Sequence, residues 1–537
     1  MRAVFPVLTL ACVLAVGIGA PVASSPGWVS PAAGSAVKMP ADGVTCSLSE
    51  GEANILRICE AVERVFESAP GIWPGYSLSR QPFIVYVPDR WVLAFNVQEA
   101  EGFGATPDGW PDLGCHMVYR PGSYAGLAGQ LAFDVPVGDT VAVAVGLPET
   151  MPESLENPEL YAFAFIVHEA FHQYQHASFG EIPWSREELY PIEDVGNTAL
   201  ASLEVRILRV AVRAGVERRE KDVRRALAEF AVVRRHRWDI ASDFVREHEQ
   251  ALELKEGTAH YVELAGVEAL GRLEYTSGVD GSVSPLPAQA RGATAGALLS
   301  EEFDERFPGD VVGPGDMARN RVYAVAAAEC FLLDVLGVDW RASAEAAGPR
   351  FTYVGLLDST AGEEPAPALT EIKRRHGYAD LQSVAERLIA ERLELYREEL
   401  AAFESQEGCR VEIRLPAGNL TRSRSGRAVR WVVNEGARTF SSHFDVYTLR
   451  GKGLSLDIRD AGVVEDTDWA TGQRCVAAFT TERPGVVTDG VPLGRDVTGP
   501  VDFGSIEIDC STVILDATWP GTISLSPDSV SVRLDRR

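Results

Sequence analysis

Residues 157–180 have the sequence NPELYAFAFIVHEAFHQYQHASFG, and the rest of the chain is best interpreted around them. Asn157 is a residue type that caps helices, and Pro158 suits the first helical turn. Gly180 is a typical helix stop. The stretch therefore predicts one helix of about twenty residues. Its first half is almost wholly apolar, which indicates a buried position.

Two histidines in this helix carry the first chemical signal. His168 and His172 are four residues apart, so their side chains project from the same face of a helix. Two imidazoles at this spacing can hold one zinc ion, while the carboxylate of Glu169 reaches toward a metal-bound water. This is the HExxH arrangement of zinc peptidases. The alternative is two incidental histidines, but unpaired polar groups are costly on a helix with apolar flanks.

The second informative segment is Leu254–Leu264, with the sequence LKEGTAHYVEL. Polar residues recur here and just before it at spacings of four, three, four and three, which places them on one stripe of a helix. Such a stripe faces either solvent or a metal site. The stripe consists of Glu249, Glu253, Glu256, His260 and Glu263.

HExxH followed by a separate helix with Glu-Gly-x-Ala resembles the gluzincin superfamily, which includes thermolysin-like peptidases and zinc aminopeptidases. The resemblance covers about residues 150–350 and implies that Glu256 is the third zinc ligand. Lys255 stands where the aminopeptidases usually have Asn, and the long separation from His172 implies a helical insertion. Glu193 lies nearer the familiar spacing and is the alternative third ligand, although Pro191 favours a loop or helix start there.

The resemblance also implies a donor that stabilises the oxyanion of the reaction. Tyr323, in a predicted helix that stops at Gly337, is one candidate for this role. His260 is the other candidate.

The N-terminal sequence and the net charge limit where the protein can be located and which partners it can bind. Residues 1–24 open with Arg2, continue as an apolar run and end in small residues, as in a secretory signal peptide. We therefore expect a secreted or extracytoplasmic protein without a membrane span after signal removal. The net charge of −27 makes nucleic acid an improbable partner, because binding a phosphate backbone needs clustered positive charge.

The predicted fold class is α+β, with a small mixed sheet packed on the HExxH helix. A flexible leader (25–45) precedes an α/β catalytic subdomain (46–180), a large helical subdomain (181–405) and a β-sandwich-like accessory domain (406–537). The strand just before the motif helix is a candidate for binding an extended peptide. Further expectations are a helix break at Gly215, a loop or surface excursion across 278–315, and disulfides within the N-terminal and C-terminal cysteine groups with Cys330 free.

These features together predict a secreted zinc metallopeptidase that acts on a peptide or protein substrate. His168, His172 and Glu256 are the predicted Zn²⁺ ligands and Glu169 the general base. Two alternatives remain at this point: an inactive zinc-binding or cell-surface binding protein, and a zinc hydrolase of non-peptide bonds.

Overall fold

The computed structural model describes residues 49–537 apart from 99–101, 108–109, 111, 123, 125–126, 128–131, 139, 148–156, 184–186, 361–366, 419, 426–428, 434–435, 469–470, 495–496, 498 and 536–537. The expected signal peptide, the leader and Cys46 lie outside the described residues. The described chain divides into two compact units, and the division falls between Glu386 and Arg387. The predicted boundary at 406 lies farther along the chain, where the strands begin.

Within the described residues, the first unit begins with one helix and a six-stranded mixed sheet. The strands follow the order β3-β4-β2-β1-β6-β5, with β1 and β6 parallel and the other pairs antiparallel. Successive residues of the strand Phe83–Val87 point to opposite faces of the sheet. Val85 points to the main core of the unit, whereas Ile84 points to a smaller core on the other face. The elements are α2 (Glu50–Ser68), β1 (Phe83–Val87), β2 (Trp91–Phe95), β3 (Gly104–Ala105), β4 (Met117–Pro121), β5 (Ala132–Val137) and β6 (Thr140–Gly146).

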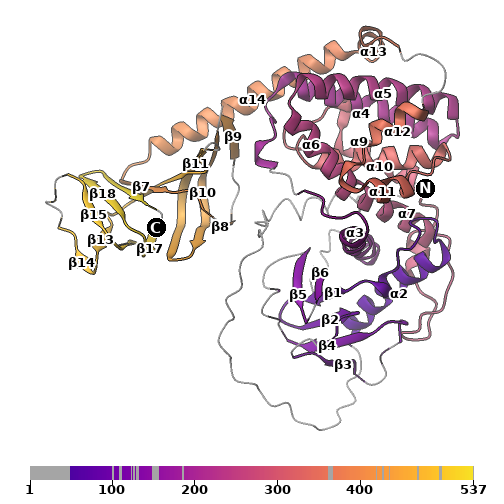
Figure 1. Ribbon diagram of the computed structural model, residues 1–537, viewed down its shortest axis with the longest axis horizontal. Helices are drawn as coiled ribbons and strands as arrows, with labels where there is room; N and C mark the ends of the chain where they lie inside the picture. Colours follow the sequence, from indigo (N-terminus) through magenta and orange to yellow (C-terminus); the bar gives the residue numbers. More distant parts are fainter. Residues whose placement is uncertain are drawn as a thin grey trace. The chain divides into compact units, whose positions relative to one another are not determined.

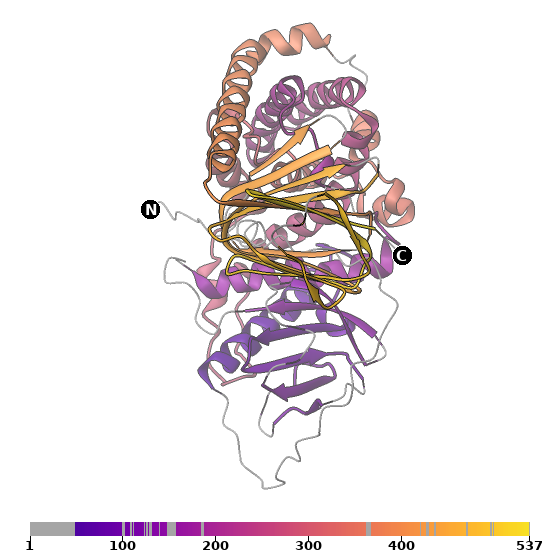
Figure 2. The same ribbon diagram turned by 90° about the vertical axis from the view of Figure 1, so that its left-hand side faces the viewer.

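The HExxH helix is α3 (Pro158–Ser178), and it packs against α2 and β6. The indigo and violet strands lie below α3 in Figure 1 and at the bottom of Figure 2. The predicted packing of a mixed sheet on the motif helix is thus confirmed. The peptide-binding role for the strand before α3 is not supported, because β6 is already paired with β1 on one side and β5 on the other.

The helical part of the first unit forms one continuous core with α3 and one face of the sheet. Its main helices are α4 (Val195–Val216), α5 (Glu220–Ile240), α6 (Asp243–Leu252), α7 (Thr258–Leu270), α9 (Ala295–Arg306), α10 (Asn320–Val335), α12 (Tyr353–Thr360) and the first part of α14 (Tyr378–Glu404), which continues into the second unit. Within the described residues, no helix combines the length and apolar character needed to cross a membrane.

Two predictions about these helices are wrong. Gly215 does not separate helices, because it lies inside α4 where an added Cβ would stand 2.9 Å from the Phe331 ring. The break comes later, at Arg218, which has a positive φ of 55°. The segment 278–315 is not a mere loop either: Thr294 caps α9, and Glu302 on α9 is buried.

The C-terminal unit is rich in β-structure, as predicted. After α14, the strands that the structure describes form one 13-stranded hydrogen-bonded sheet that curls around a core of its own. The two longest strands, β10 (Gly436–Gly451) and β11 (Leu454–Asp468), form a hairpin, and β11 pairs with β17 along its first half and β12 along its second. The others are β7 (Cys409–Leu415), β8 (Thr421–Ser425), β9 (Val429–Val433), β12 (Arg474–Thr480), β13 (Gly485–Thr488), β14 (Val491–Pro492), β15 (Val501–Phe503), β16 (Ile506–Asp509), β17 (Val513–Ala517), β18 (Gly521–Ser526) and β19 (Ser529–Leu534).

The six cysteines that the structure describes are all free thiols, so the expected disulfides are wrong for them. Strand register gives a reason in one case. Cys475 on β12 faces Arg414, while Cys409 on β7 faces Thr480. Five strand residues, roughly 17 Å, therefore separate the two thiols along the ladder, which exceeds the reach of a disulfide. Cys330 is a buried free thiol, as predicted.

Candidate metal centre

Helix α3 places the two motif histidines side by side in the interior. His168 and His172 are each 7 % exposed, and their ring centroids are 4.9 Å apart. Glu169 is half-buried, and one side-chain donor atom from each of the three residues lies within 4.8 Å of the others. Helix α3 ends before Gly180, which has the expected positive φ. Asn157 occupies the N-cap position without the expected side-chain hydrogen bond.

Glu256 reaches both histidines from another part of the chain. Its Oε2 atom lies 3.4 Å from His168 Nε2 and 3.3 Å from His172 Nε2, and the residue is only 4 % exposed. It lies on η3 (Glu253–Gly257), a single π-helical turn between α6 and α7. Glu193, the alternative ligand, is half-exposed in the turn before α4. The structure therefore brings Glu256 to the motif.

Gln175 fixes which nitrogen of His172 carries the proton. The Gln175 amide nitrogen faces acceptors, the Lys255 carbonyl at 2.7 Å and the Thr258 hydroxyl at 2.6 Å. Its Oε1 atom must then accept from His172 Nδ1, at 2.7 Å. In a neutral imidazole this leaves Nε2 as a bare lone pair directed at the Glu256 carboxylate.

His168 repeats this arrangement with a carboxylate in place of the amide. Glu263 Oε2 lies 3.1 Å from His168 Nδ1, so the hydrogen on that nitrogen has an acceptor and Nε2 again faces Glu256. When the imidazoles are neutral, two nitrogen lone pairs and a carboxylate oxygen therefore converge on one buried point. Such a set of acceptors suits a cation, and hydrogen bonds from the outer nitrogens to carboxyl or amide oxygens are typical of metal-binding histidines.

Behind Glu263 the polar chain continues through His260. His260 Nδ1 lies 3.1 Å from Glu263 Oε2, and His260 Nε2 lies 2.8 Å from Glu302 Oε2. Both ring nitrogens of His260 are therefore occupied by buried carboxylates. This placement makes His260 a support for Glu263.

The shifted pKa values of the site residues reflect the buried carboxylates around them. Burial lowers the pKa of His168, but hydrogen bonds to Glu256 and Glu263 outweigh it and raise the pKa to about 10. Burial raises the pKa of Glu256, yet His172, His168 and Arg319 together hold it well below the usual value. The carboxylates thus favour positive charge at His168, which a bound cation would supply in place of a proton.

Tyr323, on α10, lies next to the histidine pair. Its ring stacks on the His168 ring with centroids 6.0 Å apart and planes 7° apart. Arg319, one turn earlier, donates to the Tyr323 hydroxyl oxygen from Nη2 at 2.9 Å and from Nε at 3.1 Å. The same Nη2 lies 4.0 Å from Glu256 Oε1. Arg319 therefore connects the tyrosine to the third candidate ligand.

Gly257 allows η3 to approach α10 closely. A Cβ atom at Gly257 would lie 2.1 Å from the Ala326 Cβ, which is far inside van der Waals contact. Glycine is therefore needed after Glu256, because any side chain there would push η3, which carries the Glu256 carboxylate, away from α10, which carries Tyr323. This is a physical reason for the glycine of the Glu-Gly-x-Ala pattern in this chain.

We expect Gly257→Ala to lower the free energy of unfolding by about 1–3 kcal/mol, because overpacking forces the two helices apart. Metal affinity should fall as well, since Glu256 moves with η3. Chemical denaturation and a chelator competition assay measure the two effects. The double variant G257A/A326G removes the Cβ that causes the clash, so it should recover most of both losses. A Gly257→Ala protein as stable as the unmodified chain would contradict this account of the packing.

The polar stripe predicted on this part of the chain is buried, so it does not form a solvated face. Its five members are between 0 and 4 % exposed. Three site residues are new: Gln175, Glu302 and Arg319. Gln175 lies three residues after His172, a spacing that could have suggested an outer partner. Glu302 and Arg319 come from distant segments, and no local pattern indicates them.

Comparison with known proteins found no matching family model, no matching curated protein and no matching solved structure.

Proposed function

We propose that this protein is a zinc-dependent peptidase whose metal ligands are His168, His172 and Glu256. The observation that carries the proposal is the convergence of two histidine Nε2 atoms on one buried carboxylate oxygen, at 3.3 and 3.4 Å. Two imidazoles and one carboxylate form a frequent catalytic zinc set, because three protein ligands leave the fourth position open. A structural zinc site would have four protein ligands.

Zinc bound by these residues would act as a Lewis acid toward a carbonyl oxygen and would lower the pKa of a water molecule. Glu169 is next to His168 in sequence and half-buried, so its carboxylate is close to the centre and open to solvent. In the proposal Glu169 accepts the proton of the attacking water and returns it to the leaving amine. A purely structural site has no need of a carboxylate at this position.

Tyr323 supplies the second part of the proposed chemistry. It donates its hydroxyl hydrogen to the oxygen that becomes negative as the carbonyl is attacked. Arg319 holds the hydroxyl oxygen through two hydrogen bonds and brings positive charge to the same place. His260 instead orients Glu263, which in turn orients His168.

A mixed library of fluorogenic peptides tests the proposal on the full chain. Zinc-loaded protein is expected to hydrolyse some of the peptides, a chelator should abolish hydrolysis, and added zinc should restore it. Hydrolysis that survives complete zinc removal would overturn the proposal. A zinc-loaded protein that cleaves ester or amide analogues but none of the peptides would also overturn it, in favour of a hydrolase of other bonds.

A further inference from the structure

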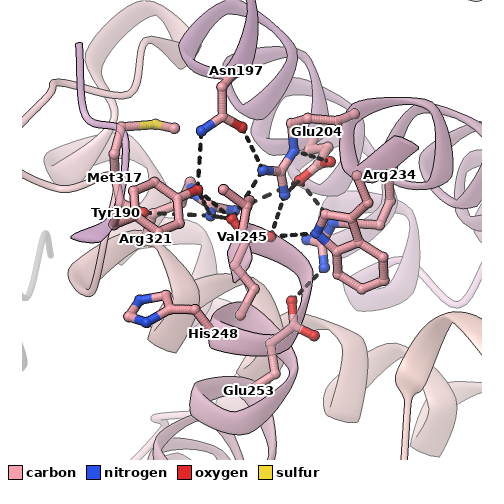
Figure 3. Close-up of polar contacts among 12 residues, drawn as sticks. Tyr190, Asn197, Glu204, Arg234, Val245, His248, Glu253, Met317 and Arg321 are labelled. Carbon is pink, nitrogen blue, oxygen red and sulfur yellow. Dashed lines mark hydrogen bonds and ion pairs between the residues drawn. The ribbon is translucent and has the colours of Figure 1, made fainter. Parts of the chain in front are cut away.

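A buried cluster of ion pairs lies one helical turn from the candidate metal centre. We call it the arginine cluster, and Figure 3 shows its guanidinium groups among carboxylates. Its members are between 0 and 2 % exposed in their side chains. They are Arg234, Arg237 and Arg321 together with Glu204, Glu249 and Glu253.

Charge balance favours ionised pairs within the arginine cluster. Burial raises the pKa of Glu329, which lies nearby, and the Glu253 carboxylate raises it further, well above its ordinary value. Burial and the Glu249 carboxylate also raise the pKa of Glu253, although Arg234 lowers it, so the pairing of Glu253 with Arg234 rests on their direct contact. Arg237 and Arg321 hold the pKa of Glu249 well below its usual value despite burial. Buried charges of this kind persist when each has a close partner.

Two of the carboxylates come from the chain that leads into the metal centre. Glu249 lies on α6 and pairs with Arg237 and Arg321. Glu253 is the first residue of η3 and pairs with Arg234, which Glu204 also contacts at 3.0 Å. Glu256 lies on the same π-helical turn and contacts the histidines instead.

The π-helical turn explains how Glu253 can contact the arginine cluster while Glu256, three residues later, contacts the histidines. In an uninterrupted α-helix, Glu253 and Glu256 lie on nearly the same face. A π-turn accommodates one additional residue, which changes the direction of the following side chains by roughly 100° at 3.6 residues per turn. An α-helical register could therefore satisfy the arginine cluster or the histidines, but not both.

We propose that Glu253 is a positioning residue: its ion pair with Arg234 holds the π-helical turn in the register that presents Glu256 to His168 and His172. This inference rests on the proposed zinc site. Loss of the Arg234 partner allows the turn to relax toward α-helical hydrogen bonding, since π-turns are rarer and occur mostly at functional sites. The Glu256 carboxylate then turns away from the histidines.

Zinc affinity of the full-length Glu253→Gln protein tests this inference. We expect a loss of roughly 10-fold or more in a chelator competition assay, in line with losses at partners of metal ligands. Cobalt(II) in place of zinc should show a changed visible spectrum, which reports the ligand geometry. In metal-free protein, backbone amides 253–257 should exchange hydrogen faster than in the unmodified chain.

Glu204→Gln is the matched control, because it neutralises another carboxylate of the arginine cluster that is not on the π-helical turn. It should lower stability without changing zinc affinity by more than about 2-fold, because Glu253 and its partner Arg234 are both retained. If Glu253→Gln does not fold, Glu253→Asp retains the charge but shortens the reach to Arg234, and it should weaken zinc binding as well.

Equal zinc affinity in Glu253→Gln, Glu204→Gln and the unmodified protein would overturn the positioning role while leaving the zinc site intact. An unmodified protein that binds no zinc would overturn both this inference and the proposed function. Weaker zinc binding in Glu204→Gln to the same extent as in Glu253→Gln would also contradict the inference, because it would indicate general loosening of the core.

Discussion

Replacing Glu169 by Gln is expected to lower the rate of peptide hydrolysis at least about 100-fold while zinc remains bound. The amide has nearly the same size and hydrogen-bonding shape as the carboxylate but cannot accept the proton of the attacking water. The three proposed ligands are untouched by the change. Steady-state kinetics on the best peptide of the library, together with zinc content, measure the two effects.

Glu159→Gln is the control for this variant, because it makes the same chemical change near the start of α3. Its rate should stay within about 2-fold of the unmodified protein, since it lies roughly 15 Å from Glu169 along the helix axis. Loss of zinc together with activity in Glu169→Gln would show that this carboxylate has a structural role. Unchanged hydrolysis would eliminate Glu169 as the base.

Removing the Glu256 carboxylate should have the largest effect on metal binding. Glu256→Ala is expected to weaken zinc binding by more than about 100-fold, because loss of outer partners alone typically accounts for 10- to 100-fold. The variant also leaves two histidines without the carboxylate that faces them. Hydrolysis should fall as a consequence, and partial recovery at high zinc concentration is expected.

Glu193→Ala separates the two candidates for the third ligand. Glu193 is half-exposed, so its removal should change zinc affinity by no more than about 2-fold. Isothermal titration of metal-free protein with zinc compares both variants directly. The opposite order of effects would support Glu193 and would reject Glu256 as the ligand.

Much of the fold could be predicted because its signals are local. The apolar runs Phe83–Val87 and Trp91–Phe95 predict two strands, and β1 and β2 have these bounds, since short apolar runs bounded by turn residues define buried strands. The α3 helix follows from its apolar run, Pro158 and Gly180 in the same way. The association of His168 with Glu256 needed the Glu-Gly-x-Ala resemblance, because the two segments are far apart in sequence.

Two kinds of feature could not be predicted from the sequence: interruptions of the regular helical repeat, and contacts between segments that are far apart in the chain. The π-helical turn at 253–257 has no marker in a pattern based on 3.6 residues per turn, so that pattern predicts a single face for the whole polar stripe. Glu302 was assigned to an irregular region although Thr294 begins a helix there. The arginines that bury Glu249 and Glu253 come from α5 and α10.

Anomalous diffraction from crystals of the full chain grown with zinc, with data on both sides of the zinc absorption edge, tests the central claim most directly. The account predicts one strong anomalous peak about 2.0–2.2 Å from His168 Nε2, His172 Nε2 and a Glu256 carboxylate oxygen. A zinc-loaded crystal with no peak between these residues, or with Glu256 turned away from a peak at the histidines, would contradict it.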